Sequence, residues 1–312
     1  MRVLVTGAAG FIGSHLVDAL LARGDDVAAL DHLRRPPRRW VADAMGRGLE
    51  LHVADVRDLD LVSAAFAAAQ PEVVLHLAAQ VDVRRSVADP AVDAMVNVAG
   101  TVSVLEAARK SGTPRIVLAS TAAVYGDPRE IPTPESAPIA PLSPYGTSKA
   151  AAEWYLAQYA RLHGLSTLAL RMANVYGPRQ DPHGEAGVVA IFTGAAAAGE
   201  GVTVYGSGGQ TRDYVFIADV VDAWLRAAAS DATGALNVGT GVRSSVLDLV
   251  AALELEHVAA PARPGEVEHS CLGPAAAAGA RGWGPAVGRG AGGGRAGPAA
   301  ARMSARGGGC TR

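Results

Sequence analysis

The sequence predicts an α/β fold in which a doubly wound parallel sheet is joined to a smaller C-terminal region. Short apolar runs alternate with helix-length segments rich in alanine and leucine, and this alternation is typical of βαβ units. After about residue 171 it gives way to loops rich in glycine and proline. The expected strands are residues 2–6, 26–30, 49–53, 73–77, 115–119 and 167–172, and segments such as 13–23 and 89–110 are long enough for crossover helices.

The composition describes a chain that can bury a core and that carries little net charge. Its 312 residues are 49% hydrophobic, and 28 basic and 30 acidic residues are dispersed along the chain, with a net charge of −2. Dispersed charges give no reason to expect a nucleic acid or an anionic membrane as partner. Cys271 and Cys310 have neither metal-ligand nor disulfide spacing, and the N-terminus shows no apolar segment long enough for a signal peptide or membrane span. We therefore expect a cytoplasmic protein without a bound metal.

The first expected strand runs into a glycine-rich turn, Thr6-Gly7-Ala8-Ala9-Gly10-Phe11-Ile12-Gly13, and then into a helix. Gly7, Gly10 and Gly13 permit a tight turn, a close approach of the backbone to a pyrophosphate and close packing of helix on strand. The N–H groups at the helix N-terminus face the anion. A glycine triplet alone also fits an ordinary turn, but the strand before it and the helix after it favour a Rossmann-type dinucleotide site.

Asp31 closes the second strand, 18 residues beyond Gly13. A carboxylate at this point can accept hydrogen bonds from both adenosine ribose hydroxyls and repels a 2′-phosphate, so the sequence favours NAD over NADP. Arg34 and Arg35 follow, and either weaken this preference or are solvated loop charges. Asp55 alone fits a helix cap as well as a cofactor contact. The remaining positions expected around the cofactor follow the third and fourth strands and are Asp55, Val56, Leu77, Ala78, Ala79 and Gln80.

A tyrosine and a lysine stand four residues apart in Pro144-Tyr145-Gly146-Thr147-Ser148-Lys149, which opens a helix after a proline-rich loop. This spacing places both side chains on one helix face, although the spacing alone is also that of an ordinary surface pair. A lysine cation beside a tyrosine favours the phenolate, which can take a proton from a sugar hydroxyl. Ser120 and Thr121 follow the strand 115–119, where a hydroxyl can hold a reacting oxygen or merely cap a turn.

Five motifs, in this order, resemble those of the UDP-glucose 4-epimerase family of extended short-chain dehydrogenases over about residues 1–272. They are the glycine-rich turn, His76-Leu77-Ala78-Ala79, Ser120-Thr121-Ala122-Ala123-Val124-Tyr125-Gly126, Tyr145-x-x-x-Lys149 and Arg171-Met172-Ala173-Asn174-Val175-Tyr176-Gly177-Pro178. The resemblance implies that Tyr145 is the general base and acid, that Lys149 binds the nicotinamide ribose and tunes Tyr145, and that Thr121 binds the sugar 4-oxygen. It also implies that Asn97 supports the cofactor pocket and that Ala173 contacts the nicotinamide through its backbone.

The residues after Thr121 separate the activities within this superfamily. Sugar-nucleotide 4,6-dehydratases carry Asp-Glu where this chain has Ala122 and Ala123, and UDP-glucuronate decarboxylases carry Glu where Ala123 stands. Epimerisation needs no such carboxylate, because it requires only hydride removal, rotation of the bound 4-keto sugar and hydride return to its other face. Tyr145, Lys149, Thr121 and NAD suffice for that, so we expect a 4-epimerase.

By the same resemblance, residues 171–212 and 243–273 form a region that binds the UDP-sugar substrate. The residues implicated are Arg212 and Arg263 for the diphosphate, Tyr205 and Val188 for the uracil, Glu266 for the ribose and Asn174 for a phosphate. Each arginine alone also fits a surface ion pair, and the segment 187–192 also fits core packing. Position 181 holds an aspartate where glucuronate-handling relatives often carry an arginine. We therefore expect UDP-glucose and UDP-galactose as substrates before UDP-N-acetylglucosamine or UDP-glucuronate.

The remaining expectations concern the domains and the partners. Residues 1–170, with a return of the chain at about 213–242, form the expected NAD-binding domain. Residues 274–312, nearly all Ala, Gly, Arg and Pro, are expected to be poorly ordered. The helices 89–110 and 147–163 resemble those of a four-helix homodimer interface in this family, or merely cover the sheet. Two other functions fit the same fold: an NAD-binding regulatory protein without turnover, and a net reductase that exchanges free NAD(P)H.

Overall fold

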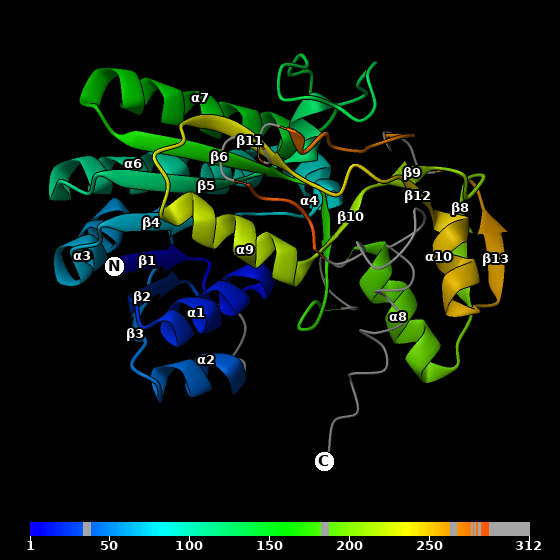
Figure 1. Ribbon diagram of the computed structural model, residues 1–312, viewed down its shortest axis with the longest axis horizontal. Helices are drawn as coiled ribbons and strands as arrows, with labels where there is room; N and C mark the ends of the chain where they lie inside the picture. Colours follow the sequence, from blue (N-terminus) through cyan, green and yellow to red (C-terminus); the bar gives the residue numbers. More distant parts are fainter. Residues whose placement is uncertain are drawn as a thin grey trace. The chain divides into compact units, whose positions relative to one another are not determined.

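The computed structural model describes residues 1–33, 39–181, 187–262, 267–275, 277, 279 and 282–286 (Figure 1). The chain divides into two compact units, each made of several segments. Unit 1 comprises Met1–Val124, Pro141–Arg171 and Val221–Leu236, and unit 2 comprises Tyr125–Ala140, Met172–Val220 and Asn237–Arg312. The sequence predicts residues 125–140 within the first domain, but they belong to unit 2, where Thr133 pairs with Leu272 in a parallel bridge.

A seven-stranded sheet with the order β11-β6-β5-β4-β1-β2-β3 forms the centre of the fold. Its strands are β1 Arg2–Thr6, β2 Asp26–Asp31, β3 Glu50–Val53, β4 Val73–His76, β5 Arg115–Thr121, β6 Ser166–Met172 and β11 Gly234–Val238. From β3 to β5 each strand pairs in parallel with its neighbour, β1 lying between β2 and β4. The strand order reverses between β1 and β4, where α/β sheets of this kind bind ligands. The predicted doubly wound fold is confirmed.

Several helices of unit 1 have side-chain N-caps or left-handed C-caps. The helices of unit 1 are α1 Phe11–Arg23, α2 Arg39–Met45, α3 Leu59–Ala69, α4 Val83–Ala88, α5 Pro90–Ala94, α6 Gly100–Ser111 and α7 Pro144–His163. The helix α9 Ile217–Ala228 belongs to unit 1 from Val221 onward. Ser143 caps α7 by accepting a hydrogen bond from Gly146 N, and Gly164 ends this helix in the left-handed conformation. In Figure 1, α3, α6 and α7 lie on one side of the sheet, away from α1 and α2.

The long helix expected over residues 89–110 is present, but its middle turn is not α-helical. It is a continuous helical run, Pro90–Ser111, whose middle turn Met95–Ala99 is a π-helix between α5 and α6. A single π turn shifts the side chains that follow it around the helix axis, and such turns are frequent at functional sites. Here the π turn holds the buried side chain of Asn97.

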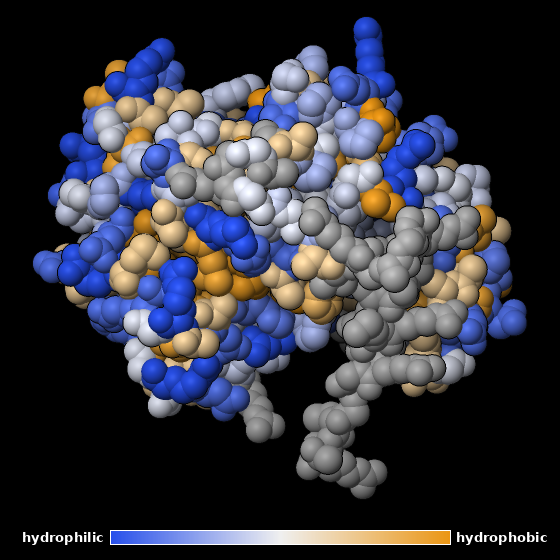
Figure 2. All heavy atoms as spheres, viewed as in Figure 1, coloured by the Kyte–Doolittle hydropathy of each residue, from blue (hydrophilic) through white to orange (hydrophobic). Residues whose placement is uncertain are grey.

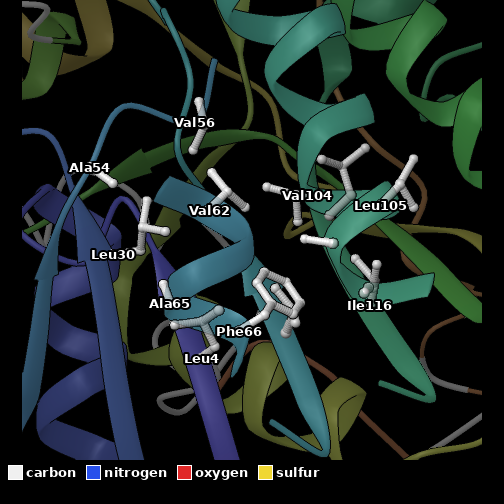
Figure 3. Close-up of a cluster of buried hydrophobic side chains, with 14 of the residues drawn as sticks. Leu4, Leu30, Ala54, Val56, Val62, Ala65, Phe66, Val104, Leu105 and Ile116 are labelled. Carbon is white, nitrogen blue, oxygen red and sulfur yellow. The ribbon is translucent and has the colours of Figure 1, made fainter. Parts of the chain in front are cut away.

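One core cluster of unit 1 lies between the sheet and the layer that contains α3 and α6. Leu4 and Leu30 from β1 and β2 meet Phe66 of α3 and Leu105 of α6 in one cluster of buried side chains (Figure 3). Each such side chain contributes about 1.5–3 kcal/mol when it leaves water. Figure 2 shows hydrophilic residues spread over the face of unit 1 that carries α1 and α2, with apolar residues among them, as is normal for a protein surface.

The described residues of unit 2 include three small pairs of strands, the helices α8 and α10 and the first turn of α9. The pairs are β7 Asn174–Tyr176 with β10 Tyr214–Phe216, β8 Val202–Tyr205 with β13 His257–Ala260, and β9 Thr211–Arg212 with β12 Ser244–Ser245. The helices α8 Val188–Ala198 and α10 Val246–Leu253 pack on these strands around Phe192, Val204 and Leu249. The buried carboxylate of Asp213 accepts hydrogen bonds from the N–H groups of Thr240, Gly241 and Leu272, so it fastens three segments of this unit together.

The described part of residues 274–312 includes a buried aromatic side chain. Trp283 is 3% exposed, and its indole Nε1 donates to the carbonyl oxygen of Asp219 at 3.1 Å. Ala286 N donates to the Asp219 carboxylate at 2.9 Å. Residues 276, 278, 280–281 and 287–312, for which the sequence predicts poor order, lie outside the described residues.

Candidate active site

The glycine-rich turn packs closely against neighbouring backbone segments. Gly7 has a φ of +71°, and a Cβ added to it would lie 2.7 Å from Ala78 N, in the loop after β4. A Cβ added to Gly13 would lie 2.2 Å from Gly7 O, so α1 packs directly on the turn. Because α1 begins at Phe11 with a glycine N-cap that offers no side-chain acceptor, the N–H groups of its first turn remain for an external anion.

Asp31 at the end of β2 is a buried, ionised acceptor. Its carboxylate accepts hydrogen bonds at 3.0 Å from Ala9 N and from Leu33 N, and lies 3.3 Å from His32 Nδ1. Burial alone would raise the pKa of Asp31, but the hydrogen bonds from His32, Leu33 and Ala9 outweigh it and hold the pKa below its usual value. A carboxylate here, beside a turn with free N–H groups, fits the ribose and pyrophosphate of NAD. Arg34 and Arg35 lie outside the described residues.

Asp55 and Val56 lie where β3 leads into α3. The helix cap that the sequence left open for Asp55 is instead Asp58, whose carboxylate accepts from Asp60 N and Leu61 N. Asp55 pairs with the Arg57 guanidinium at 2.7 and 2.9 Å, and these hydrogen bonds lower the pKa of Asp55 to about 2. A shallow hollow at this point is lined by Asp55, Arg57, Asp58, Leu59, Asp60 and Met95.

Asn97 connects the loop after β4 with α7. Its side-chain oxygen accepts from Gln80 N at 2.8 Å, and its Nδ2 lies within donor distance of Gln80 O at 2.9 Å and Ser148 Oγ at 3.0 Å. Leu77, Ala78 and Ala79, which precede Gln80, are half-buried. The predicted cofactor residues of this loop and the helix that carries Lys149 are therefore held by one buried amide.

The start of α7 lies against the end of β5. A Cβ added to Gly146 would lie 2.6 Å from Ala123 O, so only glycine allows this approach. Tyr145 is half-buried, and its backbone N–H donates to Ser86 Oγ at 3.1 Å. Thr121, at the end of β5, is half-buried, and its Oγ1 accepts from Ala123 N at 3.2 Å. The structure thus places the first turns of α7, which carry Tyr145 and Lys149, against the strand end that carries Thr121.

Lys149 is a lysine in an almost dry environment. It is 3% exposed, and Nζ donates to Ala119 O of β5 at 3.0 Å. Burial lowers the pKa of Lys149 to about 8, against the opposing effect of the carboxylates of Asp93 and Glu153. At neutral pH the side chain is therefore still mostly an ammonium.

The predicted substrate residues that the structure describes lie in unit 2. Asn174 is exposed at the start of β7, Tyr205 is half-buried at the end of β8, and Val188 is the first residue of α8. Arg212 Nη1 donates to Thr211 O at 2.9 Å and to Glu268 O at 3.3 Å. Ala173 N donates to Val238 O at 2.9 Å. Arg263 and Glu266 lie outside the described residues.

Two buried charged residues of the site were not singled out from the sequence. Glu153 and Arg171 form an ion pair at 2.6 Å, with side chains that are 8% and 6% exposed. The only signal in the sequence is the position of Glu153, one helical turn after Lys149. Within the described ranges no group of three or more His, Cys, Asp or Glu side chains is arranged to hold a metal ion.

The glycine turn after β1, the carboxylate that ends β2 and the Tyr-x-x-x-Lys pair on α7 define a dinucleotide-dependent enzyme of the short-chain dehydrogenase class. The model of the NAD dependent epimerase/dehydratase family matches residues 3–239. The chain therefore belongs to this family, as its motifs predicted, and NAD is its cofactor.

Several named proteins are similar to this chain in sequence or in structure. The UDP-glucose 4-epimerase of Mycolicibacterium smegmatis is 48% identical over 297 residues, which cover 92% of this chain and 94% of that protein. The structure resembles a UDP-glucose 4-epimerase of Thermotoga maritima with UDP-glucose, at a TM-score of 0.91 and 38% identity over 98% of both chains. It also resembles a UDP-glucose 4-epimerase of Thermus thermophilus in complex with NAD, at a TM-score of 0.88 and 44% identity over 99% of this chain and 100% of that chain.

Proposed function

We propose that the chain is an NAD-dependent epimerase that inverts C4 of a UDP-hexose, with UDP-glucose and UDP-galactose as its substrate pair. The main support for this proposal is how α7 packs on β5. The start of α7, with Tyr145 and Lys149, packs on the end of β5 with Thr121, and the two positions after Thr121 are alanines. This end of the sheet has a proton-transfer pair and no additional carboxylate at those positions, which suits reversible oxidation of one carbinol and does not suit elimination.

Tyr145 is the proton carrier in this proposal. Its phenolate takes the proton of the sugar 4-hydroxyl while the Thr121 hydroxyl holds the same oxygen. The Lys149 ammonium lies on the same helix face and stabilises the phenolate. When held by the first turn of α1 and by Asp31, NAD would supply the redox chemistry, namely reversible hydride transfer at C4 of the sugar. Tyr145 gives its proton back to the 4-oxygen, so protons and electrons balance without a further reactant.

The roles of the other predicted residues follow from the same proposal. The first turn of α1 holds the NAD pyrophosphate, and Asp31 accepts from the adenosine ribose. Asp55 and Val56 lie beside the adenine, while Gln80 and Asn97 support the nicotinamide side, with Ala173 in contact with the nicotinamide. Of the predicted substrate residues, Arg212 and Arg263 bind the diphosphate and Asn174 a phosphate. Glu266 binds the ribose, and Tyr205 and Val188 contact the uracil.

The substrate test separates this function from its alternatives. The purified protein is heated to release its nucleotide, which we expect to be NAD, and is then incubated with UDP-glucose, UDP-N-acetylglucosamine or UDP-glucuronate while NMR follows the C4 configuration. An epimerase equilibrates one of these substrates without net consumption of reduced cofactor. A net reductase consumes it in proportion to product, and a regulatory NAD-binding protein converts none of the three.

The variant Tyr145→Phe removes only the phenolic hydroxyl. We expect turnover to fall by at least about 100-fold, as for the loss of one general acid-base group. Tyr155→Phe, at an exposed position of the same helix, is the matched control and keeps its activity. Unchanged turnover in Tyr145→Phe would refute the assignment of the proton carrier.

We further propose a homodimer formed by the outer faces of Pro90–Ser111 and α7. Large apolar side chains are exposed there, among them Met95, Trp154 and Leu162, at 51%, 57% and 66%. Light scattering of the eluting protein should give twice the mass of one chain. Trp154→Glu should give the monomer, whereas Leu247→Glu, at an exposed position in unit 2, should not.

The cytoplasmic location stays a prediction that cell fractionation tests. The helical run Pro90–Ser111 is long and apolar enough, by length and composition, to cross a membrane, with 44% of its most apolar window buried. Within unit 1 its α6 portion packs on α3 and α7, as a core helix does. We expect the protein in the fraction without membranes.

A further inference from the structure

A buried ammonium needs a counter-charge, because burial without one favours the neutral amine. Lys149 has three N–H donors, of which one is accounted for by Ala119 O. The side chain is 3% exposed, so water cannot supply the missing stabilisation. While Tyr145 is still a phenol, the counter-charge within unit 1 is therefore a carboxylate, and the two carboxylates that favour the ammonium are those of Asp93 and Glu153.

Glu153 is one of two candidates for the counter-charge of Lys149, but Arg171 already pairs with its carboxylate. Its carboxylate accepts from Arg171 Nε at 3.0 Å and from Arg171 Nη2 at 2.6 Å. It also accepts from the hydroxyl of Ser120, which follows Ala119 in β5. Glu153 thus clamps the strand end whose carbonyl holds Lys149, while Arg171 neutralises most of its charge.

Asp93 is the second candidate, and its charge is not matched. It lies on α5 and is 1% exposed. Its Oδ1 accepts from Gln80 Nε2 at 2.9 Å and lies 3.2 Å from Asn97 Nδ2, both uncharged groups. Its Oδ2 is fully buried and has no hydrogen-bond partner in the part of the chain that the structure describes. Asn97 in turn contacts Ser148, the neighbour of Lys149.

The other titratable groups around Lys149 do not replace Asp93. His76 on β4 is neutral, because burial and the Lys149 charge lower its pKa to about 3. Its Nε2–H donates to Thr101 Oγ1, since Thr101 itself donates to Asn97 O, and its Nδ1 accepts from Thr6. Tyr145 lies on α7 itself. The charged residues around α4 and at the end of α6 are partly or fully exposed to solvent; they are Asp82, Arg84, Arg85, Glu106, Arg109 and Lys110.

We propose that Asp93 is the buried counter-charge that keeps Lys149 protonated, and that Glu153, paired with Arg171, fixes the carbonyl that positions the ammonium. Both act through Lys149 and are positioning residues, not catalytic ones. The inference rests on the proposed function in one respect only, namely that the charge of Lys149 matters for Tyr145.

The composition of the chain offers a direct measurement. Lys110 and Lys149 are its only lysines, so protein labelled with ¹³C-lysine gives two Cε signals, of which Lys110 is the exposed internal control. Lys149→Met assigns the signals. In the wild-type protein as purified, we expect Lys149 to titrate with a pKa near 8. A midpoint of about 5–6, as for buried lysines without a counter-charge, would overturn the proposal even if no variant folds.

The variant Asp93→Asn keeps the shape and the Oδ1 acceptor but removes the charge. We expect the Lys149 midpoint to fall by about one pH unit or more, and the alkaline limb of the pH profile of turnover to move in the same direction. Asp93→Glu should restore the wild-type midpoint, and Asp222→Asn, an exposed residue of α9, should leave it unchanged. A purely structural role for Asp93 would lower stability without moving the midpoint.

The outcomes separate this inference from the proposed function. An unmoved midpoint and pH profile in Asp93→Asn, with Tyr145→Phe inactive, would refute the counter-charge and leave the epimerase proposal intact. A lowered midpoint in a protein that converts no UDP-sugar would support the counter-charge while the proposed function fails.

Discussion

Replacing Gly13 by alanine adds one methyl group at the tightest point of the dinucleotide turn. The new Cβ would lie 2.2 Å from Gly7 O, 2.9 Å from Ala8 Cα and 3.0 Å from Gly7 C. All three are backbone atoms, so no side-chain rotation can relieve the contact. The turn must instead move by roughly 1 Å, and overpacking of this kind costs about 1–3 kcal/mol.

The same movement displaces the N–H groups that face the pyrophosphate. Because about 1.4 kcal/mol corresponds to a factor of ten in affinity, we expect NAD affinity to fall at least about tenfold. The free energy of unfolding should fall by about 1–3 kcal/mol. Calorimetric titration of nucleotide-free protein with NAD measures the first quantity and urea unfolding the second.

Gly46→Ala is the matched control, because its Cβ would lie 3.5 Å from Asp43 O, an ordinary contact. We expect it to bind NAD like the wild type. If Gly13→Ala also binds NAD with wild-type affinity and stability, this turn does not hold the cofactor and the site must be placed elsewhere.

Three further results are expected. Glu153→Gln leaves the Arg171 guanidinium buried without its counter-ion, so the free energy of unfolding in urea should fall by about 3–5 kcal/mol. Asp222→Asn, in an exposed ion pair, is the control and should lower it by less than about 0.5 kcal/mol. An equally small fall in Glu153→Gln would contradict the buried pair. His76 has a folded pKa lowered to about 3, so its contribution is complete above the unfolded value of about 6.5 and is lost as the pH falls towards 3. Between pH 7 and 5 the wild type should therefore lose about 2 kcal/mol more stability than His76→Gln, and equal losses would show that His76 is protonated in the folded state. Arg212→Ala should weaken UDP binding about tenfold in calorimetry, with exposed Arg226→Ala as control; equal affinities would remove Arg212 from the diphosphate site.

The strands and the cofactor turn could be predicted because their signals are local. A parallel strand buried on both faces reads as a short apolar run, and the glycine turn combines strand, spacing and helix within about twenty residues. Asp31 could be placed for the same reason, since the end of an apolar run marks the end of its strand.

The support around Lys149 could not be predicted, because it depends on contacts between distant segments. Glu153 after Lys149 reads like any i, i+4 ion pair on a helix surface, yet its partner is Arg171 on β6. The π turn in Pro90–Ser111 leaves no pattern in the sequence, since it reflects where Asn97 finds its partners. The assignment of residues 125–140 to unit 2 likewise depends on Thr133 meeting Leu272, 139 positions later.

Trp283 sets a practical limit on shortened versions of the protein. Its ring is enclosed and its indole nitrogen donates to the first turn of α9, so a chain cut before residue 283 would open an apolar hole and remove a hydrogen bond to that helix. Ala286 adds a second tie to the same aspartate. Truncations intended for crystallisation should therefore keep the chain at least through residue 286.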